Sequence, residues 1–382
     1  MGPFSLAKNK SDEKCQLVDC VDKIMDIFYS RLEDLPVDLL SPFADTIIKG
    51  VNALVSVTQK RIFIPVSIWM AELINEPIKS QIASVINTFI DSASLEDLKF
   101  VFNNIGVKDD KEEVIQTYND ALKQRATHDQ QVFEYLYDIA SKDIRKEWFV
   151  ELIRVDHQRA LKKLEQLDYR VDDRKSVVSA IFTRMNMLPQ IMQRKELLFA
   201  CNKMKCANDA ELKGRFAESI KALLRDTTPD PQKMGMELLQ EATYLSQTHK
   251  RDIAIDTIEY LSSLPPATAY QPSSAKSVLL AWPLLTSPPR GKLLYYVFDI
   301  LIRRGSTVQS IQLGLNIMSQ IEPKLLYEDY SKYFDDLLNR AETETDPNIK
   351  SLLINGLNGL DSKELNDRNR NFWQRVRRLS SA

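Results

Sequence analysis

Glycine is scarce in this chain, and that scarcity limits the folds that the sequence can form. Only 10 of the 382 residues are glycine, whereas an average protein contains about 7%. Tight hairpins, nucleotide-binding loops and barrel corners depend on glycine because they need positive φ angles or a close approach of the backbone. Connections between helices can be built without it. The composition therefore favours a helical protein.

Apolar side chains recur at the spacing of one helix face. The stretch 78–90 carries them at i, i+4, i+7, i+8, i+11 and i+12, and the stretches 132–139 and 294–302 repeat the pattern. Such positions share one side of an α-helix. Ser94 and Asp97 have the spacing of a capping box, which starts a helix. No segment shows sustained alternation of apolar and polar residues, so the sequence predicts an all-α fold of about 20 helices.

Prolines mark the expected helix starts in the second half of the chain, because proline is favoured in the first helical turn. They stand at Pro229, Pro289, Pro323 and Pro347. Pro289 and Pro323 are 34 residues apart, and the interval between them holds two helical patterns. This arrangement resembles degenerate repeats of the HEAT and armadillo class over residues 76–380. The resemblance implies an α-solenoid of stacked antiparallel helix pairs with one concave binding face, and it implies no activity.

Proline also indicates how the chain is divided. Six of the 16 prolines lie between 264 and 291, and proline disfavours helix at the residue before it. We expect helical repeats at 15–264, a Pro-rich connection at 265–291 with at most one short helix from Ala275 to Leu285, and further repeats with a capping helix at 292–382. Trp282 is expected to fill the gap between the two parts. Residues 1–14 are expected to be a flexible lead-in that begins with a cloning remnant, in which case the chain is a fragment of a larger protein.

The net charge is too small to attract a polyanion or a polycation to the protein as a whole. The chain has 51 basic and 53 acidic residues, a net charge of −2, so affinity for a polyanion requires local clustering. The sequence shows no signal peptide, and its strongly apolar uncharged stretch at 62–71 is too short to span a membrane. These features predict an intracellular protein, cytoplasmic or nuclear, that has no membrane partner.

The sequence lacks the motifs of common catalytic and metal sites. It has no phosphate-binding glycine loop, no nucleophile elbow and no H-E-x-x-H pair. The cysteines form two C-x4-C pairs, Cys15 with Cys20 and Cys201 with Cys206. Five residues along a helix correspond to about 500° of rotation, which points two thiols about 140° apart. We therefore predict buried thiols, no metal, no cofactor and no catalytic residue.

Basic residues gather in two places and are the candidate contacts for a partner or for phosphate. The candidates are Arg154, Arg159, Lys162, Lys163, Arg194, Lys195, Arg370, Arg375, Arg377 and Arg378. Three of them, at 159, 162 and 163, share one helix face, and ridges from neighbouring repeats could join into one positive stripe. The alternatives for this cluster are a solvated face of mixed charge, nucleic-acid phosphate and an acidic protein partner. The arginines after 368 end a helix that begins with acids, which the helix dipole favours and which is typical of a capping helix.

The function that these patterns favour is a non-catalytic helical-repeat scaffold that binds a protein partner through an extended face. One alternative is a nucleic-acid-binding helical region of a larger machine, such as one that contains an NTPase. Another is an enzyme with a motif-free site that resembles the HEAT-like DNA glycosylases, which use a tryptophan, an aspartate and an arginine. Trp148 and Asp156 lie near Arg154 and Arg159 in this sequence.

Overall fold

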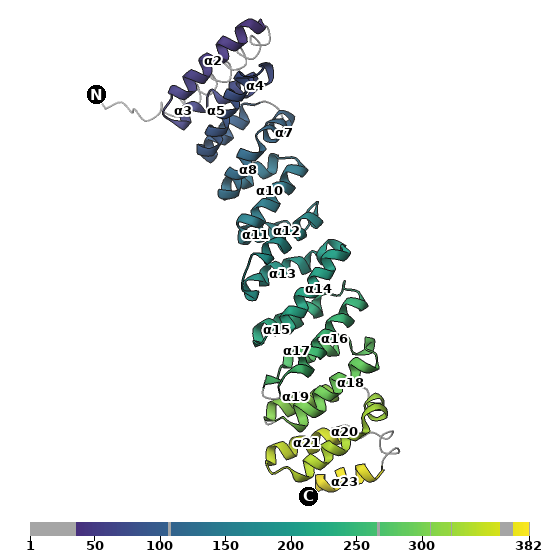
Figure 1. The fold of residues 1–382 in the computed structure, drawn as a ribbon. Helices are drawn as coiled ribbons and strands as arrows, with labels where there is room; N and C mark the ends of the chain where they lie inside the picture. The colour runs from purple at the N-terminus through teal and green to yellow at the C-terminus, as the bar shows by residue number, and fades with distance from the viewer. Residues whose placement is uncertain are drawn as a thin grey trace, which may run out of the picture. The chain divides into compact units, whose positions relative to one another are not determined.

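The computed structural model describes residues 36–105, 108–265, 268–305, 307–321, 323–359 and 370–381. Within these ranges the chain forms 21 α-helices and no strand, which confirms the all-α prediction (Figure 1). None of these helices is long and apolar enough to cross a membrane. Cys15, Cys20 and the expected lead-in at 1–14 lie outside the described residues.

The chain divides into two compact units, Met1–Ala160 and Leu161–Ala382, which we call the first and second units. The division falls inside helix α11 (His157–Gln166). The Pro-rich stretch 265–291 lies within the second unit, where it forms α17 (Pro272–Leu279), the 3-10 turn η4 (Trp282–Leu284) and the start of α18 (Ser287–Tyr295).

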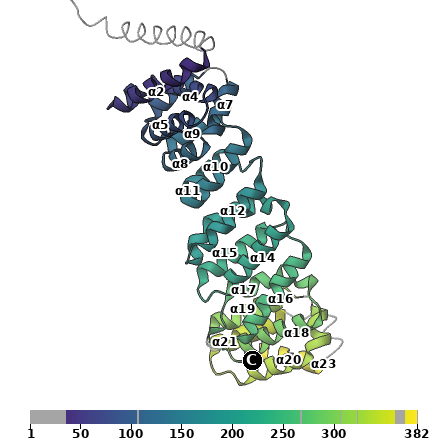
Figure 2. The same cartoon turned by 45° about the horizontal axis from the view of Figure 1, so that its top comes forward.

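The first unit is assembled around helix α5, which contacts α2, α4 and α8 (Figures 1 and 2). The predicted apolar stripe of this helix is buried at Ile82, Ile86 and Phe89. Ser94 and Asp97 form the predicted capping box at the start of α6. The helices are α2 (Val37–Ala53), α3 (Val57–Lys60), α4 (Ile64–Leu73), α5 (Ile78–Ser92), α6 (Leu95–Asn103), α7 (Lys108–Thr117), α8 (Asn119–His128), α9 (Gln130–Ile139) and α10 (Lys142–Val155).

The second unit contains the remaining helices. Proline occupies the first position of α15, α20 and α21, as the sequence predicts. The remaining elements are α12 (Arg174–Asn186), η1 (Ile191–Arg194), α13 (Lys195–Lys203), η2 (Lys205–Asn208), α14 (Ala210–Leu224), α15 (Pro229–Glu241), α16 (Gln247–Ser263), the π-helix η5 (Tyr296–Arg303), α19 (Val308–Met318), α20 (Pro323–Thr343), α21 (Pro347–Gly359) and α23 (Arg370–Ser381).

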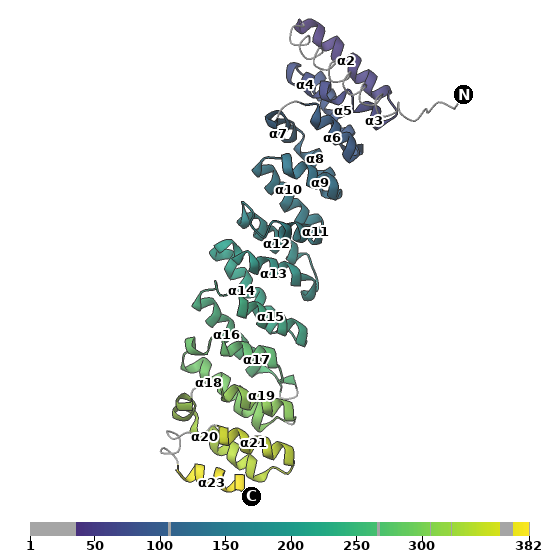
Figure 3. The same cartoon turned by 180° about the vertical axis from the view of Figure 1, so that it is seen from behind.

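Helices of the second unit stack in two layers. In one layer α13, α15, α17, α19 and α21 contact one another in chain order, and in the other α14, α16, α18 with η5, and α20 do the same. Figures 1 and 3 show the two rows beside each other. Contacts between α14 and α15, α16 and α17, and α20 and α21 join the layers into helix pairs. Each helix therefore buries its apolar face against its neighbours in the stack.

The Pro-rich stretch is part of the core of the second unit. Ala275, Val278 and Trp282 are buried in one apolar cluster with residues of α16, α18 and α19. The short helix expected from Ala275 to Leu285 is wrong in its bounds, because α17 ends at Leu279 and Trp282–Leu284 forms a separate 3-10 turn. Pro283 cannot donate a backbone hydrogen bond, so one helix cannot run through it undisturbed.

Helix α23 covers the last helices of the second unit. It contacts both α20 and α21, and it buries Phe372, Trp373 and Val376. The rings of Phe334 and Phe372 meet edge to face with their centroids 6.0 Å apart. Burial of these aromatic side chains closes the apolar cluster at this end of the unit.

Close packing between α19 and η5 depends on the absence of a side chain at Gly314. A Cβ atom there would lie 2.6 Å from Cγ1 of Ile302 and 3.3 Å from Cβ of Leu301. By contrast, a Cβ atom at Gly214 on α14 would meet nothing within 4 Å. The two glycines thus share a helical backbone but differ in their surroundings.

We expect Gly314→Ala to lower the free energy of unfolding of the chain, because overpacking costs about 1–3 kcal/mol. Gly214→Ala is the matched control and should raise it by about 0.5–1 kcal/mol, the gain in helix propensity of alanine over glycine. Urea denaturation followed by circular dichroism measures both. Equal effects of the two substitutions would contradict the close contact between α19 and η5.

Candidate functional site

Arg159, a predicted partner or phosphate contact, binds the backbone of the first unit. Its Nη2 atom donates to the carbonyl oxygens of Ala126, at 3.1 Å, and Thr127, at 2.8 Å. Both carbonyls lie in the last turn of α8, where backbone acceptors have no partner within the helix. The guanidinium also stands 5.9 Å from the ring centre of Phe133. Arg159 therefore caps a neighbouring helix.

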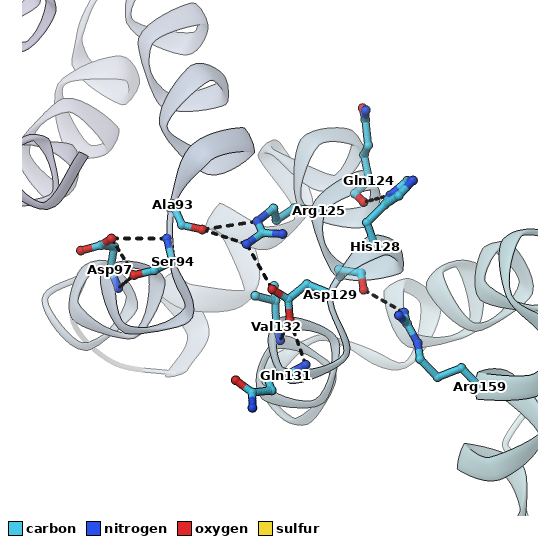
Figure 4. Close-up of polar contacts among 11 residues, drawn as sticks. Ala93, Ser94, Asp97, Gln124, Arg125, His128, Asp129, Gln131, Val132 and Arg159 are labelled. Atoms are coloured by element: carbon cyan, nitrogen blue, oxygen red, sulfur yellow. Dashed lines mark hydrogen bonds and ion pairs between the residues drawn. The ribbon is translucent and has the colours of Figure 1, made fainter. Parts of the chain in front are cut away.

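Arg125 makes the corresponding contact three helices earlier in the chain, from α8 to the end of α5. Its Nε and Nη2 atoms donate to the carbonyl of Ala93 at 3.3 and 3.1 Å, at the end of α5, and it pairs with Asp129 at 3.1 Å (Figure 4). Arg125 and Arg159 are 34 residues apart. In the second unit Arg340 donates to the carbonyl of Gly305 at 3.0 Å, just after η5 ends. The spacing of Arg125 and Arg159 was the sequence signal for this role, and the sequence analysis missed it.

Two further candidates of the first basic cluster also have partners within the protein. Arg194 donates to the carbonyl of Leu188 through Nε, at 3.1 Å, and Nη2, at 2.7 Å. Arg154 pairs with Glu151 at 3.1 Å on the surface of α10. Lys162 and Lys195 are exposed and Lys163 is half-buried. The predicted positive stripe therefore has its lysines at the surface, whereas the guanidinium groups of Arg159 and Arg194 are bound to backbone carbonyls.

The C-terminal arginines differ in their roles. Arg375 binds Glu342 through two hydrogen bonds, at 3.1 and 2.6 Å, and also donates to Asn339 at 3.2 Å. These contacts attach α23 to α20 and match a capping helix. Arg370, Arg377 and Arg378 are exposed on α23.

The residues of the enzyme alternative serve packing and capping. Trp148 is fully buried and donates through its indole N–H to Oδ1 of Asn119 at 2.6 Å. Oδ1 of Asp156 accepts the backbone N–H of Arg159 at 3.1 Å, which caps the start of α11. A ligand in a groove could not reach the ring of Trp148.

Cys201 and Cys206 are free thiols, and both are buried as predicted. The sequence analysis placed them on one helix, but Cys206 lies beyond the end of α13. Helix α13 ends at Lys203, and the four residues Lys205–Asn208 have positive φ angles between 48° and 57°. Cys206 therefore lies in a left-handed turn, with its Sγ 3.4 Å from Oη of Tyr244. Burial raises the pKa of the Cys206 thiol to about 11, and a protonated thiol is a poor nucleophile and metal ligand. The described residues contain no group of three or more His, Cys, Asp or Glu that could hold a metal ion.

A hollow of about 250 Å³ lies among helices α4, α5, α7 and the start of α8 in the first unit. Its floor is formed by Ile68, Ala71, Val114 and Tyr118, each less than 10% exposed. Its rim carries the exposed side chains of Glu72, Lys79, Asn87, Glu113 and Thr117. The sequence analysis missed it, because its lining comes from four elements. A second hollow, between η5 and α20, measures only about 10 Å³, which is room for one water molecule at most.

The charged side chains on the rim of the larger hollow are not paired with one another. No ion pair joins Lys79 to Glu72 or Glu113 among the described side chains. Burial raises the pKa of Glu72, and the charges of Glu113 and Asp110 raise it further. Burial and the nearby charge of Glu72 also raise the pKa of Tyr118 to about 12.

The outward sides of α19 and α21 carry a row of uncharged polar side chains, which we call the amide row. On each helix the row follows the spacing i, i+3, i+7, and its members are exposed except for the half-buried Gln312. The row consists of Gln309, Gln312 and Asn316 on α19, and Asn348, Ser351 and Asn355 on α21. Because α19 and α21 contact each other, the two series lie on neighbouring helices. Within α19, Gln312 donates to Oδ1 of Asn316 at 2.9 Å.

Comparison with known proteins gives no family. No protein-family model and no curated protein matches the sequence. One solved structure, an engineered protein from the Northeast Structural Genomics Consortium, is 12% identical and aligns over 94% of this chain and 97% of that chain, with a TM-score of 0.34. A likeness at that TM-score carries no argument, so the resemblance to HEAT and armadillo repeats stays a prediction.

We expect Arg159→Met to lower the free energy of unfolding by about 2 kcal/mol, since hydrogen bonds from a charged donor contribute about 1.5–3 kcal/mol. Arg154→Met removes an exposed pair and should cost less than about 0.5 kcal/mol. Urea denaturation measures both variants, and hydrogen exchange of α8 amides gives a local check. If Arg159 were a surface contact only, the two variants would be equally stable.

Proposed function

We propose that the chain is a non-catalytic helical-repeat scaffold that binds a protein partner along the amide row of the second unit. The observation that carries this proposal is the uncharged, exposed side formed by α19 and α21 together. Both helices are held from behind by η5 and α20, so their outward sides are free to contact another molecule.

The chemistry of the row favours a protein partner. Charged residues make up 27% of the chain, yet none of the six row positions is charged. Removing a neutral amide from water costs far less than removing a charge, and an amide both donates and accepts hydrogen bonds. Charged residues are depleted in the centres of protein interfaces. A face with these properties can be covered by a polypeptide at low cost.

The opposite layer of the second unit has a different surface. Its helices α14 and α16 expose Glu211, Glu218, Arg251 and Glu259. Such exposed charges are well solvated, and covering them with a partner costs more free energy than covering neutral amides. This contrast supports a contact on α19 and α21 rather than on α14 and α16.

Nucleic acid is less well supported as a partner. Phosphate recognition needs several free lysines or arginines on one surface, but Arg159, Arg194 and Arg375 are hydrogen-bonded within the protein. Lys162, Lys195, Arg370 and Arg378 are exposed and remain for such a contact. No observation favours an enzyme, and the proposal takes the chain to be without catalytic activity.

We expect the double substitution Asn316→Lys and Asn355→Lys to weaken partner binding at least about tenfold, because two charges would be buried without partners at the interface. The matched control is Ala222→Lys with Thr248→Lys, which adds the same charge to exposed positions of α14 and α16. Proximity labelling in the source cells, followed by a binding titration of the labelled protein, compares the two variants with the parent chain.

Two results would contradict this proposal. One is a partner that both double variants bind as tightly as the parent chain does. The other is retention of nucleic acid with an affinity that falls steeply as salt rises, since that slope counts released counterions. Circular dichroism of each variant checks that the helices are intact.

A further inference from the structure

We propose that the hollow of the first unit binds an organic cation, a guanidinium or ammonium group on a short apolar stem. This inference does not rest on the amide row, which belongs to the second unit. It rests on the shape of the hollow, the charge of its rim and the hydroxyl group of Tyr118, which has no hydrogen-bond partner among the described residues.

The charge of the rim is unbalanced. Glu72 and Glu113 contribute two carboxylates and Lys79 contributes one ammonium group. The charges of Glu113 and Asp110 both raise the pKa of Glu72, and Lys79 has a smaller effect in the opposite direction. Like charges this close destabilise each other, so a bound cation would relieve their repulsion.

Tyr118 gives a second and independent indication of a ligand. The residue is 6% exposed and lines the hollow, yet its hydroxyl group has no hydrogen-bond partner among the described residues. The hydroxyl oxygen is not among the fully buried polar atoms that lack a partner, so it is open to the hollow. Its oxygen can accept an N–H from a cation held by Glu72, and its ring can face the charge from the apolar side.

The floor and the volume define the class of cation. About 250 Å³ exceeds the roughly 30 Å³ share of one water molecule several times over, and drug-sized ligands occupy about 300–1,000 Å³. A bare metal ion would leave the apolar floor of Ile68, Ala71 and Val114 without a contact. A guanidinium on three or four methylene groups places its charge at the rim and its stem on that floor.

The experiment is a titration of the full chain with N-butylguanidinium, followed by NMR or calorimetry. N-butylguanidinium has about eight non-hydrogen atoms, and for a ligand of that size we expect a Kd of about 1 mM. N-butylurea has nearly the same shape without the charge and should bind at least about tenfold more weakly. Two results overturn the proposal and leave water as the content of the hollow. One is equal binding of the two probes, and the other is binding of N-butylguanidinium that does not saturate by about 20 mM, 20-fold the expected Kd.

Variants locate the site. Glu72→Gln should weaken N-butylguanidinium about tenfold, and Tyr118→Phe should weaken it about threefold, by the loss of a charge-assisted and a neutral hydrogen bond respectively. The control is Glu96→Gln, which removes an exposed carboxylate that pairs with Lys99 on α6, and it should bind like the parent chain. Equal loss in the Glu96 variant, or none in the Glu72 variant, excludes this hollow as the site.

The same cation can come from a free small molecule or from an arginine side chain of a protein. A peptide with a central arginine, blocked at both ends, distinguishes the two sources. Tighter binding than N-butylguanidinium indicates an arginine of a partner, and weaker binding indicates a free amine or guanidine. Because the Glu72 variant leaves the amide row unchanged, failure here is distinguishable from failure of the proposed function.

Discussion

Stacked helices face one constraint before any other: the carbonyl groups at a helix end lose access to water when a neighbouring helix covers them. These acceptors have no partner within their own helix, and burying one unpaired costs about 1–3 kcal/mol. In the first unit Arg125 and Arg159 supply the missing donors, each from the next helix along the stack. Arginine fits this role because its several N–H groups reach two acceptors at once and its charge strengthens each bond.

This use of arginine determines which surfaces are left for binding. Guanidinium groups that bind carbonyls or carboxylates within the fold, such as Arg194 and Arg375, are not available for phosphate. The second unit then offers an uncharged amide row, and the first unit offers a hollow with an acidic rim and an apolar floor. These surfaces differ in chemistry and belong to separate units, so each can act on its own. The net charge of −2 indicates the chemistry of neither the amide row nor the hollow.

What the sequence could predict was the part of the fold set by neighbouring residues. The all-α class, the Ser94 capping box and the prolines at helix starts follow from patterns within a few positions. The role of Arg159 could not be predicted in this way, because its acceptors lie 32 and 33 residues earlier in the chain. The left-handed turn at Lys205–Asn208 contains no glycine to indicate it. The candidate hollow combines Glu72, Glu113 and Tyr118 from separate helices, and only folding brings them together.

The second unit meets the same constraint with other residues. The hydroxyl of Ser274 donates to the carbonyl of Leu224 at 2.6 Å, at the end of α14, and the hydroxyl of Tyr296 donates to Ala269 at 2.6 Å. Arg340 again serves the end of η5. Any donor of suitable reach satisfies a helix end, so the requirement fixes a position in space and leaves the residue type open. A stack built on that requirement can keep its helix spacing without a fixed residue type at each helix end, and Arg125 and Arg159, 34 residues apart, meet it with the same residue.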